Sequence, residues 1–213
     1  MIVDPEIKQI IDQYDREAEA TSWFGSEVVF GLMFKFIQPG ERVLDIGIGT
    51  ALSAVLFHKV GLEIQGMDIS PEMLAASQAK LPDAVLQQHD LLEEPYPYSS
   101  GSMNHALCVG VMQFFEKPEV IFREAARILK PSGKFGFVFA EKGVVEDSEI
   151  SVDSHHVDPD KTITLYRHDL AEIEKWSEKN NLLIVRTISF PVYMSRDKKR
   201  SFRALAVITE KQA

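Results

Sequence analysis

Residues 43–51 read Val-Leu-Asp-Ile-Gly-Ile-Gly-Thr-Ala, and this stretch decides the fold. The short apolar run Arg42 to Ile46 has the composition of a buried strand, and two glycines follow it. Glycine suits such a turn because a Cβ would block the close approach of a ligand and would oppose positive φ values. Thr50 then opens the next helix, whose free N–H groups favour an electronegative group nearby. The stretch therefore predicts a strand, a tight turn and a helix, with a ligand bound at the turn.

An acidic residue, Asp68, lies 19 residues after Gly49, at the end of the next apolar run. A carboxylate at that place can accept hydrogen bonds from both hydroxyls of a ribose. A glycine pair alone is often only a tight turn, but its combination with Asp68 favours an adenosine-type ligand. A dinucleotide fingerprint would also need a third glycine three positions after Gly49, where this chain has Leu52. Leu52 therefore disfavours a nicotinamide oxidoreductase.

Apolar runs of strand type alternate with helical patterns from Arg42 to Phe139, which is typical of a parallel sheet covered by helices. Polar residues dominate Glu141 to Arg167, where we expect an irregular segment. The last two strand runs are joined by a link too short for a crossover helix, so they should pair antiparallel. The expected strands are Arg42–Ile46, Glu63–Met67, Ala84–Gln88, His105–Val109, Gly133–Phe139, Leu182–Phe190 and Phe202–Thr209. The expected helices are Pro5–Ala20, Glu27–Ile37, Pro71–Lys80, Pro118–Lys130 and His168–Asn180.

The composition limits the function classes. With 213 residues, of which 45% are hydrophobic and 26% charged, the chain can bury one sizeable core, so we expect a single domain over residues 1–213. A formal net charge of −9 disfavours nucleic acid or an anionic membrane as a partner. No apolar run approaches the roughly 20 residues that cross a bilayer, and the first residues lack a leader pattern. We expect a soluble cytoplasmic protein whose one cysteine, Cys108, is a buried, inert thiol.

The stretch from Asp45 resembles the first motif, D-x-G-x-G-x-G, of class I S-adenosylmethionine-dependent methyltransferases, with Ala51 in place of the last glycine. The likeness runs from about Glu41 to Phe139, and Glu124–Phe139 is similar to a helix, turn and strand common in small-molecule members. It implies an α/β fold, a Rossmann-like three-layer sandwich with a mostly parallel seven-stranded sheet and an antiparallel last strand. It also implies S-adenosylmethionine as cofactor and S-adenosylhomocysteine as product.

The resemblance also assigns site residues by the part of the cofactor that they would hold. These are Asp45, Gly47, Gly49 and Thr50 for the methionine portion; Asp68 for the ribose; Ile69, Asp90 and Leu91 for the adenine; Val109 and Gly110 for the methyl-transfer opening; and Tyr14 with Trp23 for a lid. Core packing remains an alternative for the two lid aromatics. The expected parts of the domain are an N-terminal helical lid (1–40), a cofactor-binding core (41–140), an acceptor-side insert (141–167) and a terminal helix with a strand pair (168–213).

Methyl transfer is an in-line displacement from an activated sulfonium, so a general base is optional. The candidates for a base are His155, His156 and Glu141, and an exposed loop is the simpler interpretation of the histidine pair. Two adjacent histidines lack metal-ligand spacing, and we expect no metal. The leading hypothesis is a methyltransferase acting on a small molecule, as a monomer or homodimer. The rival is a binding protein that keeps the cofactor fold without catalysis, which Ala51 and the missing base would favour.

Overall fold

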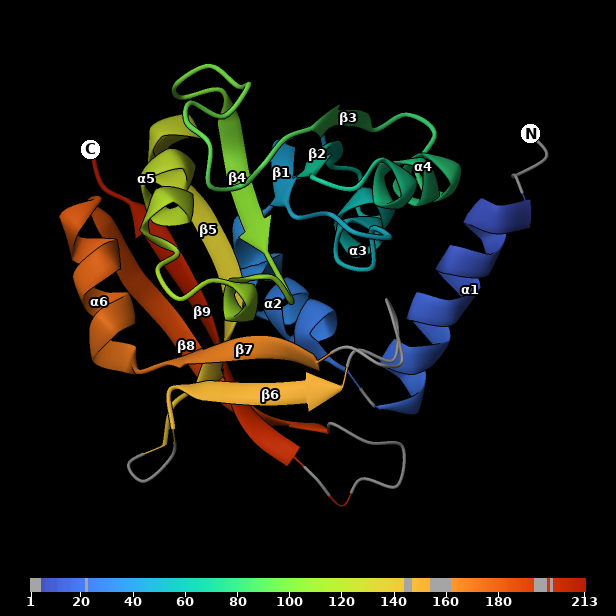
Figure 1. Ribbon diagram of the computed structural model, residues 1–213. Helices are drawn as coiled ribbons and strands as arrows, with labels where there is room; N and C mark the ends of the chain where they lie inside the picture. The colour runs from blue at the N-terminus through green and yellow to red at the C-terminus, as the bar shows by residue number, and fades with distance from the viewer. Residues whose placement is uncertain (1–4, 22, 144–146, 154–161, 194–198, 200) are drawn as a thin grey trace.

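A mixed sheet of nine strands forms the centre of the described part of the molecule (Figure 1). The computed structural model describes residues 5–21, 23–143, 147–153, 162–193, 199 and 201–213. The strands are β1 (Arg42–Ile46), β2 (Glu63–Asp68), β3 (Val85–Gln88), β4 (Met103–Cys108), β5 (Leu129–Glu141), β6 (Glu149–Asp153), β7 (Thr162–His168), β8 (Leu182–Tyr193) and β9 (Ser201–Lys211). The helices are α1 (Pro5–Ala20), α2 (Gly25–Met33), α3 (Ala54–Lys59), α4 (Pro71–Lys80), α5 (Glu119–Ile128) and α6 (Leu170–Lys179), with short 3-10 turns η1 (Phe34–Phe36) and η2 (Met112–Phe114).

The strand order is β3-β2-β1-β4-β5. On the side of β5 that pairs with β4, the end of β5 pairs with β7, which in turn pairs with β6. On the other side of β5 lie β9 and then β8. The first five strands pair in parallel, and β9 runs antiparallel to both β5 and β8. Parallel strands end at one edge of the sheet, so the segments that follow β1, β2, β3 and β4 meet there. This edge carries the glycine turn.

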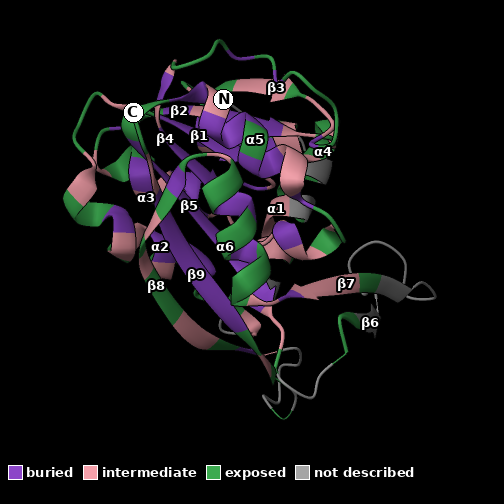
Figure 2. Cartoon of the chain, turned by 90° about the vertical axis from the view of Figure 1, so that its left-hand side faces the viewer, coloured by how far each residue is buried: buried purple, intermediate pink, exposed green. Residues whose placement is uncertain are grey.

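Helices cover both faces of the sheet, which gives the three layers that were predicted. One apolar core lies between the sheet and α5 with α6 (Figure 2). It includes Phe122 and Trp176. The other lies between the sheet and α2, α3 and α4, and includes Met33 and Phe57. Local signals set the helix starts: the Ser70 hydroxyl accepts a hydrogen bond from the Met73 N–H (3.2 Å), and Asp169 with Glu172 forms a capping box for α6.

The predicted mixed sheet is confirmed, but the expected count of seven strands and the irregular segment Glu141–Arg167 are wrong. Two further strands, β6 and β7, form an antiparallel hairpin in that segment. β7 pairs with the end of β5 at Ala140 and Glu141, beyond the point where β4 stops. Thr162–His168 does alternate in the period of a strand, but its residues are too polar to resemble the buried strands around it. His168 consequently ends β7 and does not start α6.

Gly136 in β5 allows α2 to pack closely on the sheet. A Cβ at this position would lie 2.5 Å from the Met33 sulfur and 2.8 Å from Cγ1 of Val29. We expect Gly136→Ala to lower the free energy of unfolding by about 1–3 kcal/mol, because the stiff Val29 side chain must move. Gly31→Ala is the matched control: no atom lies within 4 Å of its Cβ position, and alanine should stabilise the exposed helix by about 0.5–1 kcal/mol. Urea unfolding measures both, and a neutral Gly136→Ala would contradict this packing.

Candidate functional site

A cavity of about 350 Å³ opens at the carboxyl edge of the sheet. Its floor is formed by Asp45 and by the glycine turn after β1, where Gly47, Ile48, Gly49, Thr50, Leu52 and Ser53 line the cavity. Helix α1 contributes Tyr14 and Ala18, and the segment after β4 contributes Val109 to Val111. The volume lies at the lower end of the range of small-molecule sites, about 300–1,000 Å³. Segments far apart in the sequence thus enclose one site.

The glycine turn has the backbone geometry that its sequence predicts. Gly47 has φ +74° and Gly49 has φ +53°, values at which glycine carries no steric cost. A Cβ on Gly47 would lie 2.6 Å from Cγ2 of Val111, whereas no atom stands within 4 Å of a Cβ built on Gly49. The N–H groups of Gly47 and Ile48 donate to the Met67 carbonyl (2.9 and 3.0 Å), which fixes the turn to β2.

Ala51, where the family motif has glycine, also has a positive φ, +63°, and it is fully buried. A left-handed conformation costs an alanine roughly 1–2 kcal/mol. Its methyl group returns about 0.8 kcal/mol through burial. The burial therefore offsets roughly half of the strain, which explains how alanine is accommodated in the turn.

We expect Ala51→Gly to change the free energy of unfolding by no more than about 1 kcal/mol, because relief of strain offsets the lost methyl contact. Ala51→Val should cost more than about 2 kcal/mol, since a β-branched residue at positive φ is strained and would also overpack the core. Urea unfolding of both variants checks this pair of values. Equal destabilisation by Gly and Val would contradict it.

Asp68, at the end of β2, holds the turn from the neighbouring strand. Its Oδ2 accepts a hydrogen bond from the Gly49 N–H (2.9 Å), and its Oδ1 accepts one from the Ser70 N–H (3.0 Å). The Ser77 hydroxyl of α4 also donates to the Gly49 carbonyl (2.6 Å). A carboxylate has about four lone-pair sites, so Asp68 keeps acceptor capacity for hydroxyl groups.

Among the described residues that line the cavity, Asp45 is the one acidic residue, and none is basic. Only 2% of Asp45 is exposed, and its Oδ2 has no hydrogen-bond partner in the described part of the chain. Burial, and secondly the charge of Asp68, raise the pKa of Asp45 from 3.8 to about 7. A buried, unpartnered carboxylate oxygen at a cavity wall is suited to a cationic donor.

The raised pKa predicts how stability varies with pH. The folded state holds the Asp45 proton more tightly than the unfolded state, so the free energy of unfolding should fall as pH rises from about 4 through about 7. At 1.36 kcal/mol per pKa unit this amounts to at most about 4 kcal/mol. The advantage of the wild type over Asp45→Asn should therefore shrink by a few kcal/mol between pH 5 and pH 8. Urea unfolding at both pH values measures it, with the exposed Asp83→Asn as control, and parallel curves for wild type and Asp45→Asn would contradict it.

The residues assigned to the adenine lie apart from the cavity, where β2 and β3 end. Ile69 is 60% exposed, whereas Leu91 is buried in the apolar core. The Asp90 Oδ1 accepts a hydrogen bond from the Leu92 N–H (2.9 Å). The His89 N–H donates to the Asp68 carbonyl (3.0 Å), so this segment adjoins the proposed ribose residue. None of the three adenine residues is among those that line the cavity, and their roles stay predictions.

Helix α1 is joined to the site by a polar contact that the sequence did not suggest. Both oxygens of Asp15 accept hydrogen bonds from the Lys80 ammonium of α4 (2.8 and 2.7 Å), and Oδ1 also accepts one from the Thr50 hydroxyl (3.2 Å). These partners are 65 and 35 residues away, and no local pattern links them. Tyr14, the neighbour of Asp15, lines the cavity, and burial and the charge of Asp68 raise its pKa.

None of the candidate bases is among the described residues that line the cavity. Glu141 accepts hydrogen bonds from the Ser189 hydroxyl (2.6 Å) and the Arg203 Nε (3.4 Å), which tie it to β8 and β9. His155 and His156 lie outside the described residues. Cys108 is fully buried, and burial together with the charge of Asp45 raises its pKa well above the usual value, in agreement with an inert thiol. No group of three or more His, Cys, Asp or Glu side chains suited to a metal occurs in the described part of the chain.

The remaining cavity wall is mainly apolar. Trp23, Val192 and Phe202 line it, and Gln113 adds an amide group. The Trp23 indole lies 3.5 Å from the Cβ position of Gly110, and its ring contacts Phe190 with centroids 6.4 Å apart. The sequence indicated Trp23 and Gly110, whereas Val192, Phe202 and Gln113 had no signal that separated them from ordinary strand and turn residues. This wall can enclose an apolar group beside the glycine turn and exclude water from it.

Comparison with known proteins finds methyltransferases that are similar to the central part of this chain. Residues 44–137 match the family model described as a methyltransferase domain. The ubiquinone biosynthesis O-methyltransferase of Xanthomonas oryzae pv. oryzae is 28% identical over 98 residues, which cover 45% of this chain and 41% of that relative. The chain therefore matches less than half the length of these curated relatives. Together with the fold, these matches support a class I S-adenosylmethionine-dependent methyltransferase, as the glycine turn implied.

Solved structures share the fold at low sequence identity. An S-adenosylmethionine-dependent methyltransferase of Methanosarcina mazei has a TM-score of 0.73 at 13% identity, covering 85% of this chain and 97% of that one. A chain from a complex of the Haloferax volcanii Trm112 methyltransferase activator with a methyltransferase also has a TM-score of 0.73, at 21% identity and full coverage of both chains. The magnesium protoporphyrin IX methyltransferase of Synechocystis, solved with bound S-adenosylmethionine, has a TM-score of 0.65 at 18% identity, covering 95% and 84%. No helix within the described residues is long and apolar enough to cross a membrane.

Proposed function

We propose that the chain is an enzyme that moves a methyl group from S-adenosylmethionine to a small-molecule acceptor in the cavity beneath α1. The observation that carries this is the glycine turn with its two carboxylates. Asp68 accepts a hydrogen bond from the Gly49 N–H. Asp45 lines the cavity, and its buried Oδ2 has no described hydrogen-bond partner. An ammonium group such as that of the methionine portion would satisfy this oxygen and keep Asp45 ionised.

The groups at this edge of the sheet are arranged in the order of the parts of the cofactor that they would bind. Asp45 would bind the ammonium group, the backbone of Gly47 and Gly49 with Thr50 would surround the methionine portion, and Asp68 would bind the ribose hydroxyls. The adenine would lie toward Ile69, Asp90 and Leu91, and Val109 would border the methyl-transfer opening. The position of Asp68 and of the His89–Asp90 segment on neighbouring strand ends supports this order.

The cofactor supplies a methyl group already activated on a sulfonium, and the protein's residues supply proximity and exclusion of water. Trp23, Val192 and Phe202 surround the space beside the turn with apolar surface. An acceptor seated there would meet no carboxylate or basic group of the described lining other than Asp45, which favours an uncharged acceptor. We propose α1, with Tyr14, as the lid of this site. Glu141, His155 and His156 remain candidates for a base.

The relatives support a small acceptor. The curated relatives from Xanthomonas are named for an O-methylation step in the biosynthesis of ubiquinone, a small molecule. The Haloferax complex pairs a chain of similar fold with a protein activator, which extends the partners to be tested beyond the monomer or homodimer that we favour. Light scattering of the purified chain distinguishes these assemblies.

Binding calorimetry with S-adenosylmethionine, S-adenosylhomocysteine and NAD tests the cofactor. We expect both sulfur nucleosides to bind, and Asp68→Asn to weaken them by a factor of about 10–100, because charge-assisted hydrogen bonds contribute roughly 1.5–3 kcal/mol. Asparagine keeps the shape of the aspartate side chain, but its one carbonyl oxygen can accept from the Gly49 N–H or the Ser70 N–H and not from both. Glu63→Gln, at the exposed start of the same strand, is the control and should leave affinity unchanged. Binding of NAD with neither sulfur nucleoside would overturn the proposal.

A screen of uncharged aromatic and aliphatic acceptors, read as release of S-adenosylhomocysteine, tests catalysis. Turnover with any acceptor would support the enzyme. Tight cofactor binding with silence across a broad panel would favour the rival, a protein that binds the cofactor without catalysis.

A further inference from the structure

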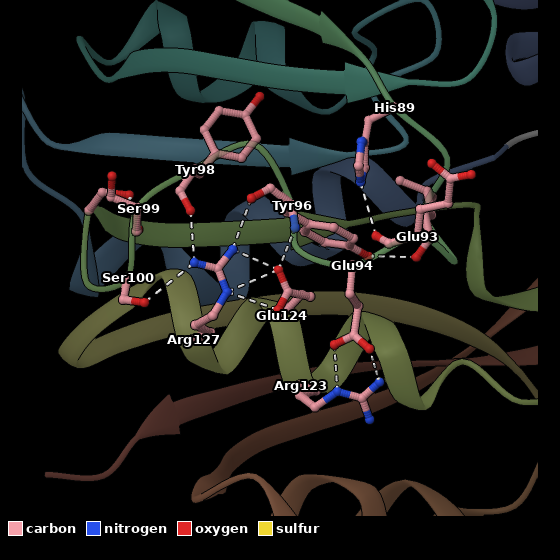
Figure 3. A network of polar contacts seen from close by, with 12 residues as sticks. His89, Glu93, Glu94, Tyr96, Tyr98, Ser99, Ser100, Arg123, Glu124 and Arg127 are labelled. Atoms are coloured by element: carbon pink, nitrogen blue, oxygen red, sulfur yellow. Dashed lines mark hydrogen bonds and ion pairs between the residues drawn. The ribbon is translucent and has the colours of Figure 1, made fainter.

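The loop between β3 and β4, residues 89–102, carries Asp90 and Leu91 and is held by side chains of helix α5 (Figure 3). The Glu124 carboxylate accepts a hydrogen bond from the Tyr96 N–H (2.6 Å). Arg127, one turn further along α5, donates to the carbonyl oxygens of Tyr96 (3.0 Å) and Tyr98 (2.8 Å). The backbone of the loop is therefore fixed by two side chains of a helix that packs on the core.

Glu124 and Arg127 form a desolvated pair. Glu124 is 3% exposed, and its carboxylate accepts hydrogen bonds from the Arg127 Nε (2.9 and 3.0 Å) and Nη2 (2.7 Å). The Arg127 side chain is 27% exposed. A buried carboxylate is costly unless it is paired and hydrogen-bonded, and Arg127 meets that need within α5. A rearrangement of the loop would remove the Tyr96 N–H from Glu124 and the Tyr96 and Tyr98 carbonyls from Arg127. The pair thus holds the loop in one conformation.

Tyr96 passes this constraint on to the adenine segment. Its side chain is almost fully buried, and its hydroxyl donates to the Leu91 carbonyl (3.0 Å). Its ring packs edge-on against His89, with centroids 5.4 Å apart. Residues on both sides of Asp90 therefore depend on Tyr96. The Leu92 N–H donates to the Asp90 Oδ1 (2.9 Å), and the Glu93 N–H donates to the Asp90 carbonyl (3.1 Å), so a tight turn forms at Asp90.

We propose that Glu124 and Arg127 are positioning residues that set, through Tyr96, the place of Asp90 and Leu91 for the adenine of the cofactor. The inference rests on the proposed function, because it uses Asp90 as the acceptor of the adenine amino group. Neither residue touches the cofactor. Their contribution is to selectivity for adenine, since a carboxylate accepts from an amino group only when it is held within hydrogen-bond distance.

A second pair on the same helix provides a matched control. Arg123 forms a bidentate pair with Glu94 of the same loop (Figure 3). These side chains are 46% and 36% exposed, and exposed pairs contribute little. The inference therefore requires Arg127 and Glu124, but not Arg123, to govern selectivity.

The test compares two ligands, S-adenosylhomocysteine and S-inosylhomocysteine. Inosine carries a carbonyl oxygen in place of the adenine amino group, so it presents an acceptor and not a donor at the position that would face Asp90. We expect the wild type to prefer the adenosyl ligand by a factor of about 10–100. Arg127→Gln and Glu124→Gln should reduce the preference below about threefold, while Arg123→Gln keeps it. A merely structural role of these residues would alter only the folded fraction of the protein. The ratio of the two affinities does not depend on the folded fraction, so a change in this ratio reports on selectivity.

Tyr96→Phe gives a milder variant in case the others fail to fold, because it keeps the ring and deletes only the bond to the Leu91 carbonyl. It should lower the preference by several-fold. An unchanged preference in the α5 variants, or an equal loss in Arg123→Gln, would overturn the inference. Wild type that binds both ligands equally would also overturn it. Wild type that binds neither ligand would instead refute the proposed function.

Discussion

The hydrogen bond from the Gly49 N–H to the Asp68 carboxylate joins the ends of β1 and β2, and the rest of the site depends on it. Parallel strands bring these ends close together, but only a polar contact fixes the turn relative to the next strand. Asp68 also accepts from the Ser70 N–H, so the same carboxylate sets the start of α4. From α4, Ser77 returns a hydrogen bond to the Gly49 carbonyl. Strand, turn and helix are thus closed into one rigid unit, and a residue assigned to ligand binding is also a structural residue.

The electrostatics of the site follow from this arrangement. Burial raises the pKa of Asp45, and the nearby charge of Asp68 adds to the effect. No lysine or arginine lines the described cavity to balance them. A cationic ligand would therefore be favoured over a neutral one of the same shape. S-adenosylmethionine carries one more positive charge than S-adenosylhomocysteine, so the same field that attracts the cofactor would assist release of the product.

The parts of the fold and the site that could be predicted from the sequence are those with a local pattern of residues. The strand before Gly47, the acid at Asp68 and the cap at Ser70 follow from periodicity, spacing and turn chemistry, and the mixed sheet with antiparallel β9 followed from the short link before it. The β6–β7 hairpin was missed because its residues lack the apolar character of buried strands. The contacts of Asp15 with Lys80, and of Glu124 with Tyr96, join residues distant in sequence. Side-chain pairs of this kind depend on tertiary packing, which a single sequence does not encode in any local pattern.

The attachment of α1 has a consequence for how a ligand could enter. Among its described polar contacts are the hydrogen bonds of the Asp15 carboxylate with Lys80 and Thr50, and Asp15 is 36% exposed in its ion pair with Lys80. A partly exposed ion pair contributes far less than the stability of a whole domain. Local detachment of α1 would therefore be much more frequent than global unfolding. Ligand exchange can proceed through this local opening while the sheet and the glycine turn remain folded, so the residence time of a ligand would be governed by the first helix of the chain.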